Sequence, residues 1–107
     1  MVIVEGELSA VIRKIVELAK RYSMEGEKVG ILATDGSIYE YGIGLVKSMG
    51  SRGSLKSIAK NLFRRLRDFD GEEVDIIIAE DIPQEGLGLA IMNRLRKAAG
   101  YSIVKTE

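Results

Sequence analysis

The stretch Val74-Asp75-Ile76-Ile77-Ile78-Ala79 (VDIIIA, residues 74–79) decides the fold class. Apart from Asp75 the segment is apolar, and the three successive isoleucines leave its centre without a polar face. Such an uninterrupted apolar run is typical of a strand that is covered on both sides, and strands of this kind occur in parallel sheets. The segment therefore predicts an α/β protein in which helices cover both faces of a sheet.

Helices are predicted before and after this strand, because apolar residues there recur every three or four positions. One helix is predicted over residues 55–69 and another over residues 87–99, with Gly100 as its C-cap. The same spacing predicts a third helix over residues 8–22, and Ser9 is a suitable N-cap for it.

Further strands are predicted at residues 2–4, 28–33 and 102–104, and one more around residues 42–46. Strands and helices thus alternate along the chain, which favours a mainly parallel sheet with right-handed crossovers. We predict one domain over residues 1–107, a small three-layer α/β/α sandwich of Rossmann-like type.

Composition excludes several function classes. The chain has no Cys and no His, so a thiolate metal site, a Ser-His-Asp triad and a His-ligated zinc centre are excluded. An enzyme that uses only carboxylates and Lys is the least favoured hypothesis, and no catalytic residue, metal ligand or cofactor is predicted. The sixteen basic and sixteen acidic residues balance, so direct nucleic-acid binding is not expected.

Two further expectations concern the protein's surroundings. No apolar run approaches the length of a membrane span, so we expect a cytoplasmic protein without a membrane contact. The few Asn and Gln residues, Asn61, Gln84 and Asn93, together with many charges, are typical of thermophiles.

The loop Gly50-Ser51-Arg52-Gly53-Ser54 (GSRGS) is a candidate anion or nucleotide site. It combines a flexible backbone, two hydroxyls and a cation immediately before a helix N-terminus, where the helix dipole favours a negative charge. The loop lacks the Gly-Lys-Ser/Thr ending of a P-loop. The alternative is an ordinary loop in which Ser54 is the N-cap.

The pair Gly86-x-Gly88 opens the last helix, as a phosphate-binding turn would. However, Ile91 occupies the position where the dinucleotide fingerprint has a small residue, and no acidic residue follows at the required distance. We therefore interpret these glycines as a tight turn that allows close packing.

Charge is segregated although it balances overall. Residues 51–67 contain six basic side chains and no acid, and residues 68–85 contain eight acids and no base. We interpret the basic segment as a solvated helix face, although phosphate contacts are an alternative. Arg94 is expected at the border of a buried helix face, where it needs a partner such as Asp70 or Glu80. Asn93 lies beside it.

Two longer motifs carry a family resemblance. NLFRRLRDFD (residues 61–70) and GLGLAIMNRLRKAA (residues 86–99) together resemble the C-terminal domain of the two-domain L-threonylcarbamoyladenylate synthases. Three shorter segments fit in order: residues 4–6 (VEG), 28–33 (KVGILA) and 50–52 (GSR). Within the long motifs, the candidate structural or interface residues are Asn61, Arg67, Asp70, Gly86, Gly88, Asn93 and Arg94.

The resemblance implies a Rossmann-like domain that accompanies a YrdC-like catalytic domain. That family makes threonylcarbamoyl-AMP from threonine, bicarbonate and ATP for the threonylcarbamoyladenosine modification of tRNA. Its catalytic pocket lies in the YrdC-like domain, for which these 107 residues leave no room, so no catalytic residue is carried over.

Two functional hypotheses remain. In the first, the chain is a non-catalytic accessory domain that packs beside a YrdC-like catalytic domain, in cis or in trans, with a contact to ATP or AMP as a further expectation. In the second, it is an independent small nucleotide- or anion-binding protein that uses the GSRGS loop. An exposed apolar face would favour the first hypothesis. Glycine-rich loops that cap two helices on one sheet edge would favour the second.

Overall fold

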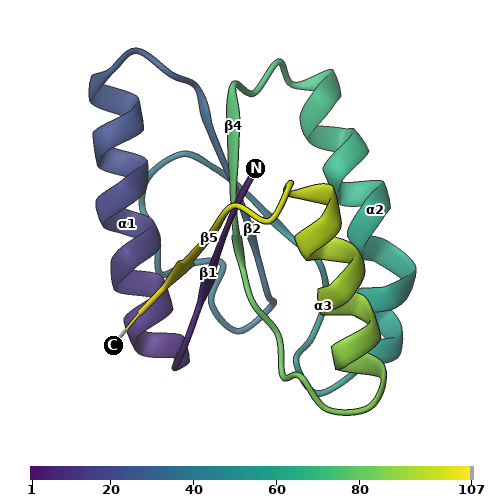
Figure 1. Cartoon of the computed structure of the whole chain (residues 1–107). Helices are drawn as coiled ribbons and strands as arrows, with labels where there is room; N and C mark the ends of the chain where they lie inside the picture. The colour runs from purple at the N-terminus through teal and green to yellow at the C-terminus, as the bar shows by residue number, and fades with distance from the viewer. Residues whose placement is uncertain (107) are drawn as a thin grey trace.

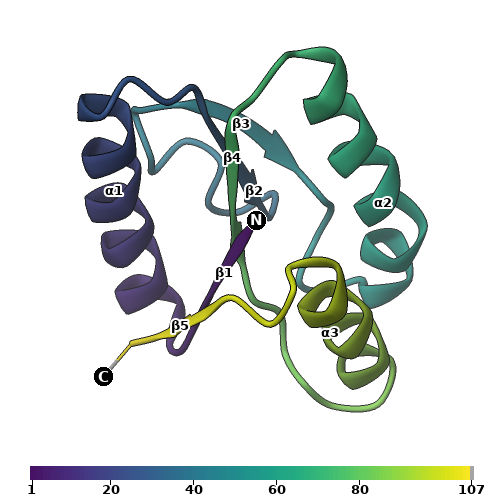
Figure 2. The ribbon, with the colours of Figure 1, turned by 45° about the horizontal axis from the view of Figure 1, so that its top comes forward.

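A parallel sheet separates one helix from the other two in the structure, a computed structural model that describes residues 1–106 (Figures 1 and 2). The strands are β1 (Val2–Glu5), β2 (Val29–Ala33), β3 (Leu45–Ser48), β4 (Ile76–Glu80) and β5 (Ile103–Lys105). The helices are α1 (Leu8–Met24), α2 (Leu55–Gly71) and α3 (Leu87–Ala98). Helix α1 covers one face, and α2 and α3 cover the other, so the predicted three-layer α/β sandwich is confirmed.

All strand pairs are parallel, and the strand order is β3-β2-β4-β1-β5. Strand β4 lies between β2 and β1, with Ile78 level with Ile31 on one side and Ala79 level with Ile3 on the other. Its side chains alternate between the two cores, as the apolar run at residues 74–79 predicted. Ile76 and Ile78 pack on the α1 side, whereas Ile77 and Ala79 pack on the side of α2 and α3.

Two cores hold the layers together. On the α1 side, Val11, Ile15 and Ala19 of the helix are fully buried against the sheet. On the other side, Leu62 of α2 and Leu95 of α3 are fully buried in a second core.

Some element boundaries differ from the predictions. The N-cap of α1 is Glu7, whose side chain accepts a hydrogen bond from the Ser9 backbone N–H at 3.1 Å, so the assignment of Ser9 as the cap was wrong. Strand β3 begins at Leu45, later than expected, because the connection over residues 34–44 forms turns. Ile38, Tyr41 and Ile43 of this connection pack against the core on the α1 side, where a crossover helix would otherwise lie.

Candidate functional site

The carboxyl edge of the sheet gathers the buried polar side chains of the described residues. Because the strands are parallel, all of them end at this edge, which lies at the bottom of Figure 1. The neighbouring strands β1 and β4 are followed by helices on opposite faces of the sheet, α1 and α3 (Figure 1). Open parallel sheets bind ligands in the crevice at such a switch point.

Glu80, the last residue of β4, is fully buried at this edge. Its carboxylate accepts hydrogen bonds from four side chains: the hydroxyls of Thr34 (2.8 Å), Ser37 (2.5 Å) and Tyr41, and the Arg52 guanidinium (3.2 Å). Burial of a carboxylate is costly unless the group is paired and hydrogen-bonded in this way. Burial and the neighbouring Glu80 carboxylate raise the pKa of Tyr41, so its hydroxyl remains a proton donor.

Arg52, the cation of the GSRGS loop, is directed inward to this network. Its Nε donates to Thr34 Oγ1 at 3.2 Å, and its Nη2 donates to Glu80 and to the Asp81 carbonyl oxygen at 2.7 Å. The loop also satisfies part of its own backbone, since the Gly53 N–H donates to the Ser51 hydroxyl at 3.1 Å. The guanidinium that was predicted to meet an external anion therefore neutralises Glu80 here, and an anion site at residues 50–54 remains a prediction. Ser54 is the N-cap residue of α2, without a side-chain capping bond.

A second ion pair lies beside the first, between β1 and α3. Arg96 Nε donates to Glu5 Oε2 at 2.8 Å, and its Nη2 donates to Glu5 Oε1 at 3.1 Å. Such a bidentate pair is strong and fixes the geometry of both groups. The Glu5 hydrogen bond and its charge raise the pKa of Arg96.

Asp81 follows Glu80 and is nearly buried, with 8% of its surface exposed. One carboxylate oxygen accepts the Gly6 backbone N–H at 3.2 Å. Burial raises the pKa of Asp81, and the charge of Glu5 adds to this effect. Arg52 and the Gly6 N–H act in the opposite direction.

The Gly86-x-Gly88 turn packs tightly, as its sequence predicted. Gly86 has a φ of 53°, a left-handed conformation that favours glycine. A Cβ atom at Gly88 would lie 1.8 Å from the Pro83 carbonyl oxygen, so no larger residue fits there without a backbone shift. The Gly88 N–H donates to the Glu85 carbonyl and the Leu89 N–H to that of Gly86, so both amides are already used within the turn.

Arg94 does not pair with an acid within residues 1–106, so the predicted pair with Asp70 or Glu80 was wrong. Helix α3 turns Ile91, Met92 and Leu95 inward, which leaves Arg94 exposed. Its guanidinium lies over the Phe63 ring of α2, 4.5 Å from the centroid, as a cation–π contact.

A shallow apolar groove of about 100 Å³ lies between α2 and α3 beside this contact. The residues that line it are Ala59, Leu62, Phe63, Leu87, Ala90, Ile91 and Arg94. Of the remaining candidates, Arg67, Asp70 and Asn93 are exposed and Asn61 is half-buried. The structure does not bring these four residues into one hydrogen-bonded cluster within its described part.

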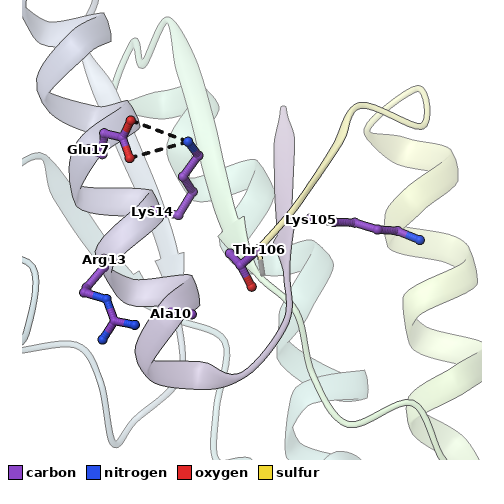
Figure 3. Close-up of a pocket in the computed structure, with 6 residues that line it drawn as sticks. All are labelled: Ala10, Arg13, Lys14, Glu17, Lys105 and Thr106. Atoms are coloured by element: carbon purple, nitrogen blue, oxygen red, sulfur yellow. Dashed lines mark hydrogen bonds and ion pairs between the residues drawn. The ribbon is translucent and has the colours of Figure 1, made fainter.

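A basic hollow between α1 and β5 is open to solvent and poorly organised (Figure 3). Lys14 is engaged with Glu17, and the Arg13 and Lys105 side chains point in different directions. The cations therefore do not converge on one point. Among residues 1–106 no cluster of three or more acidic side chains could hold a metal ion, and no helix there is long and apolar enough to span a bilayer.

Glu5, Glu80, Asp81 and Arg96 were not recognised from the sequence as site residues. Glu5, Glu80 and Asp81 share a sequence signal, an acidic residue at the end of a short apolar strand, as in VIVEG and IIIAED. In a parallel sheet such acids must meet at the carboxyl edge.

Comparison with known proteins gives one consistent family. The model of the C-terminal domain of threonylcarbamoyl-AMP synthase matches residues 1–100. The threonylcarbamoyl-AMP synthase of Pyrococcus abyssi is 46% identical over 105 residues, which are 98% of this chain and 29% of the relative. That of Bacillus subtilis is 45% identical over 92 residues, 86% of this chain and 27% of the relative.

Solved structures agree with this result. The P. abyssi protein Sua5 in complex with L-threonine superposes with a TM-score of 0.86 at 43% identity, over 99% of this chain and 29% of that one. The C-terminal Sua5 domain from Pyrococcus horikoshii has a TM-score of 0.78 at 42% identity, over 98% of this chain and 94% of that one. The chain thus spans less than a third of the full-length relatives but nearly all of a domain that was crystallised by itself.

Proposed function

The chain belongs to the family of threonylcarbamoyl-AMP synthase C-terminal domains, and we propose that it is a non-catalytic accessory domain that packs beside a YrdC-like catalytic domain. The observation that carries this proposal is the extent of the match. Residues 1–100 fit the C-terminal domain, whereas the larger part of each full-length relative lies outside the matched region.

The chemistry of the carboxyl edge supports an accessory role. Glu80 and Glu5 are each neutralised by an arginine within the domain, so neither is available as a general base. Arg52 is likewise held by Glu80 and the Asp81 carbonyl. These groups stabilise the loops at the strand ends, and a contact with ATP or AMP remains a further proposal.

The surface of α3 also supports this role. Leu87 and Leu89 are 44% and 45% exposed, and Leu87 lines the apolar groove against α2. An accessory domain is expected to show apolar surface where it meets its partner. The alternative of independent nucleotide binding has one supporting feature, because the loops before α2 and α3 lie at the same sheet edge. Their internal hydrogen bonds weigh against it.

An activity assay in trans tests the proposal. The catalytic part of the P. abyssi relative is produced without its C-terminal domain, and pyrophosphate release from ATP, threonine and bicarbonate is followed with and without this chain. We expect no release by the chain alone and a saturable change in rate when it is added to the catalytic part. Release by the chain alone would refute the non-catalytic role, and a rate that never responds to the chain would contradict the accessory role.

A further inference from the structure

A hollow of about 300 Å³ opens at the carboxyl ends of β1 and β4. The residues that line it are Glu5, Gly6, Asp81, Gln84, Lys105 and Thr106. It lies at the switch point between α1 and α3, the position where open parallel sheets bind ligands. Its floor is closely packed, since a Cβ atom at Gly6 would lie 1.8 Å from Thr106 Oγ1.

Asp81 is the one carboxylate at this hollow without a cation partner in the described chain. Glu5 pairs with Arg96, but no basic group of residues 1–106 lies within ion-pair distance of Asp81. One Asp81 oxygen accepts the Gly6 N–H, and the other has no hydrogen bond there. Every fully buried side-chain N or O in the described part has a partner. The Asp81 oxygen without a hydrogen bond is therefore accessible, and Asp81 lines this hollow.

This arrangement is unfavourable for the isolated domain. Asp81 is buried and has no ion-pair partner in the described chain, so the Gly6 N–H and the more distant charge of Arg52 offset the hydration that its carboxylate loses only in part. The raised pKa of Asp81 has the same origin, because burial is its largest cause. A group in this situation in a cleft is typical of a binding site.

The charge around Asp81 selects a cationic partner group. In a Rossmann-like nucleotide site the phosphate would lie at the N-terminus of the helix after β1. Here the Glu7 carboxylate already occupies that position, where it accepts the Ser9 N–H at 3.1 Å. Together with Asp81 it repels a phosphate and attracts an ammonium group.

Two other residues that line the hollow, Gln84 and Lys105, offer hydrogen-bond donors. Gln84 Oε1 accepts from Arg96 at 2.7 Å, which leaves the Gln84 amide NH₂ for another acceptor. The Lys105 ammonium forms no ion pair within residues 1–106, and its side chain extends away from α1 toward α3 (Figure 3). These donors suit a carboxylate, and Lys105 disfavours a ligand that carries positive charge alone.

We propose that this hollow binds a small α-amino acid as its zwitterion. The ligand's ammonium group donates to the free oxygen of Asp81, and its carboxylate accepts from Lys105 and Gln84. The volume is at the lower end of the range of small-molecule sites, so a short side chain fits best. The site would exist in the domain alone, so this inference is independent of the proposed accessory role.

An NMR titration of the chain tests the proposal. Glycine, L-serine and L-threonine are each added to about 20 mM, a concentration that saturates a site of millimolar affinity. We expect saturable shifts of the Gly6 and Asp81 amides and of the Gln84 side-chain NH₂. N-acetylglycine and glycine methyl ester, which each lack one charge, should bind at least about tenfold more weakly, as expected for the loss of a charged hydrogen bond.

Variants identify the residues. Asp81→Asn and Lys105→Met should each weaken binding by about tenfold or more. Lys14→Met, in the neighbouring basic hollow, is the matched control and should leave the affinity unchanged. Asp81→Asn preserves the side-chain shape and removes a charge that has no ion-pair partner in the described chain, so it should fold, as its amide spectrum will show. Absence of saturable shifts with all three amino acids would overturn the proposal, as would shifts that persist unchanged in Asp81→Asn and Lys105→Met.

Discussion

Replacement of Glu80 by alanine tests whether the buried carboxylate organises the carboxyl edge. Glu80 accepts hydrogen bonds from Thr34, Ser37, Tyr41 and Arg52, which belong to two different loops. Without the carboxylate, the Tyr41 hydroxyl loses its acceptor and Arg52 loses its ion-pair partner. Both loops should then become less ordered.

The magnitude follows from the burial of the pair. Removal of one partner of a buried ion pair costs about 3–5 kcal/mol, because the remaining charge is left uncompensated. Glu80 is fully buried, but the Arg52 side chain is 25% exposed and can reach solvent in part. We therefore expect Glu80→Ala to lower the free energy of unfolding by about 3 kcal/mol. Glu80→Gln keeps the shape and one acceptor oxygen, so it should lose about half as much.

Urea unfolding at pH 7, followed by circular dichroism, measures both variants against the unmodified chain. Tyr41→Phe is the matched control, because it removes a single donor and leaves the ion pair intact. It should be the least destabilised of the three variants. A loss below about 1 kcal/mol for Glu80→Ala, the size of one ordinary hydrogen bond, would refute the reasoning. So would a Glu80→Gln variant as unstable as Glu80→Ala.

Three other variants give separate tests. Gly88→Ala should lower the free energy of unfolding by about 3 kcal/mol, because the new Cβ would lie 1.8 Å from a backbone oxygen. Gly71→Ala is the control and should be neutral in the same urea experiment, because a Cβ there would have no neighbouring atom within 4 Å. Arg96→Ala leaves Glu5 buried without its partner, so we expect a loss of about 3 kcal/mol; an unchanged unfolding midpoint would contradict this. The folded-state pKa of Asp81 is raised, so its ionisation destabilises the fold at neutral pH. Asp81→Asn should therefore have the higher melting temperature at pH 7, and this advantage should shrink as the pH falls toward about 4; a lower melting temperature at pH 7 would contradict the assignment.

The architecture was predictable because apolar periodicity is a local signal. The run at residues 74–79 predicted a strand covered on both faces, and β4 contributes side chains to both cores. Close packing at Gly86-x-Gly88 was likewise readable, because the residues required for a phosphate site were missing. The start of β3 was less predictable, since the connection before it packs as a layer of turns rather than as a helix.

The partners of charged side chains were harder to predict, because they depend on how distant segments meet. Arg94 was expected to pair with an acid, but the rotation of α3 places it over Phe63, while Arg96 reaches Glu5, 91 positions away in the sequence. The helical wheel does not determine this rotation, because neighbouring positions on the border of the buried face differ by small angles. The inward orientation of Arg52 depends in the same way on Glu80, 28 positions later.

The central claim is that this chain acts through a catalytic partner domain, and calorimetric titration tests it most directly. The chain is titrated with the isolated YrdC-like catalytic part of the P. abyssi relative and, separately, with ATP. The account predicts saturable binding to the catalytic part and no ATP binding of comparable strength by the chain alone. Micromolar ATP binding by the chain, without binding to the catalytic part, would contradict it and would favour nucleotide binding at residues 50–54.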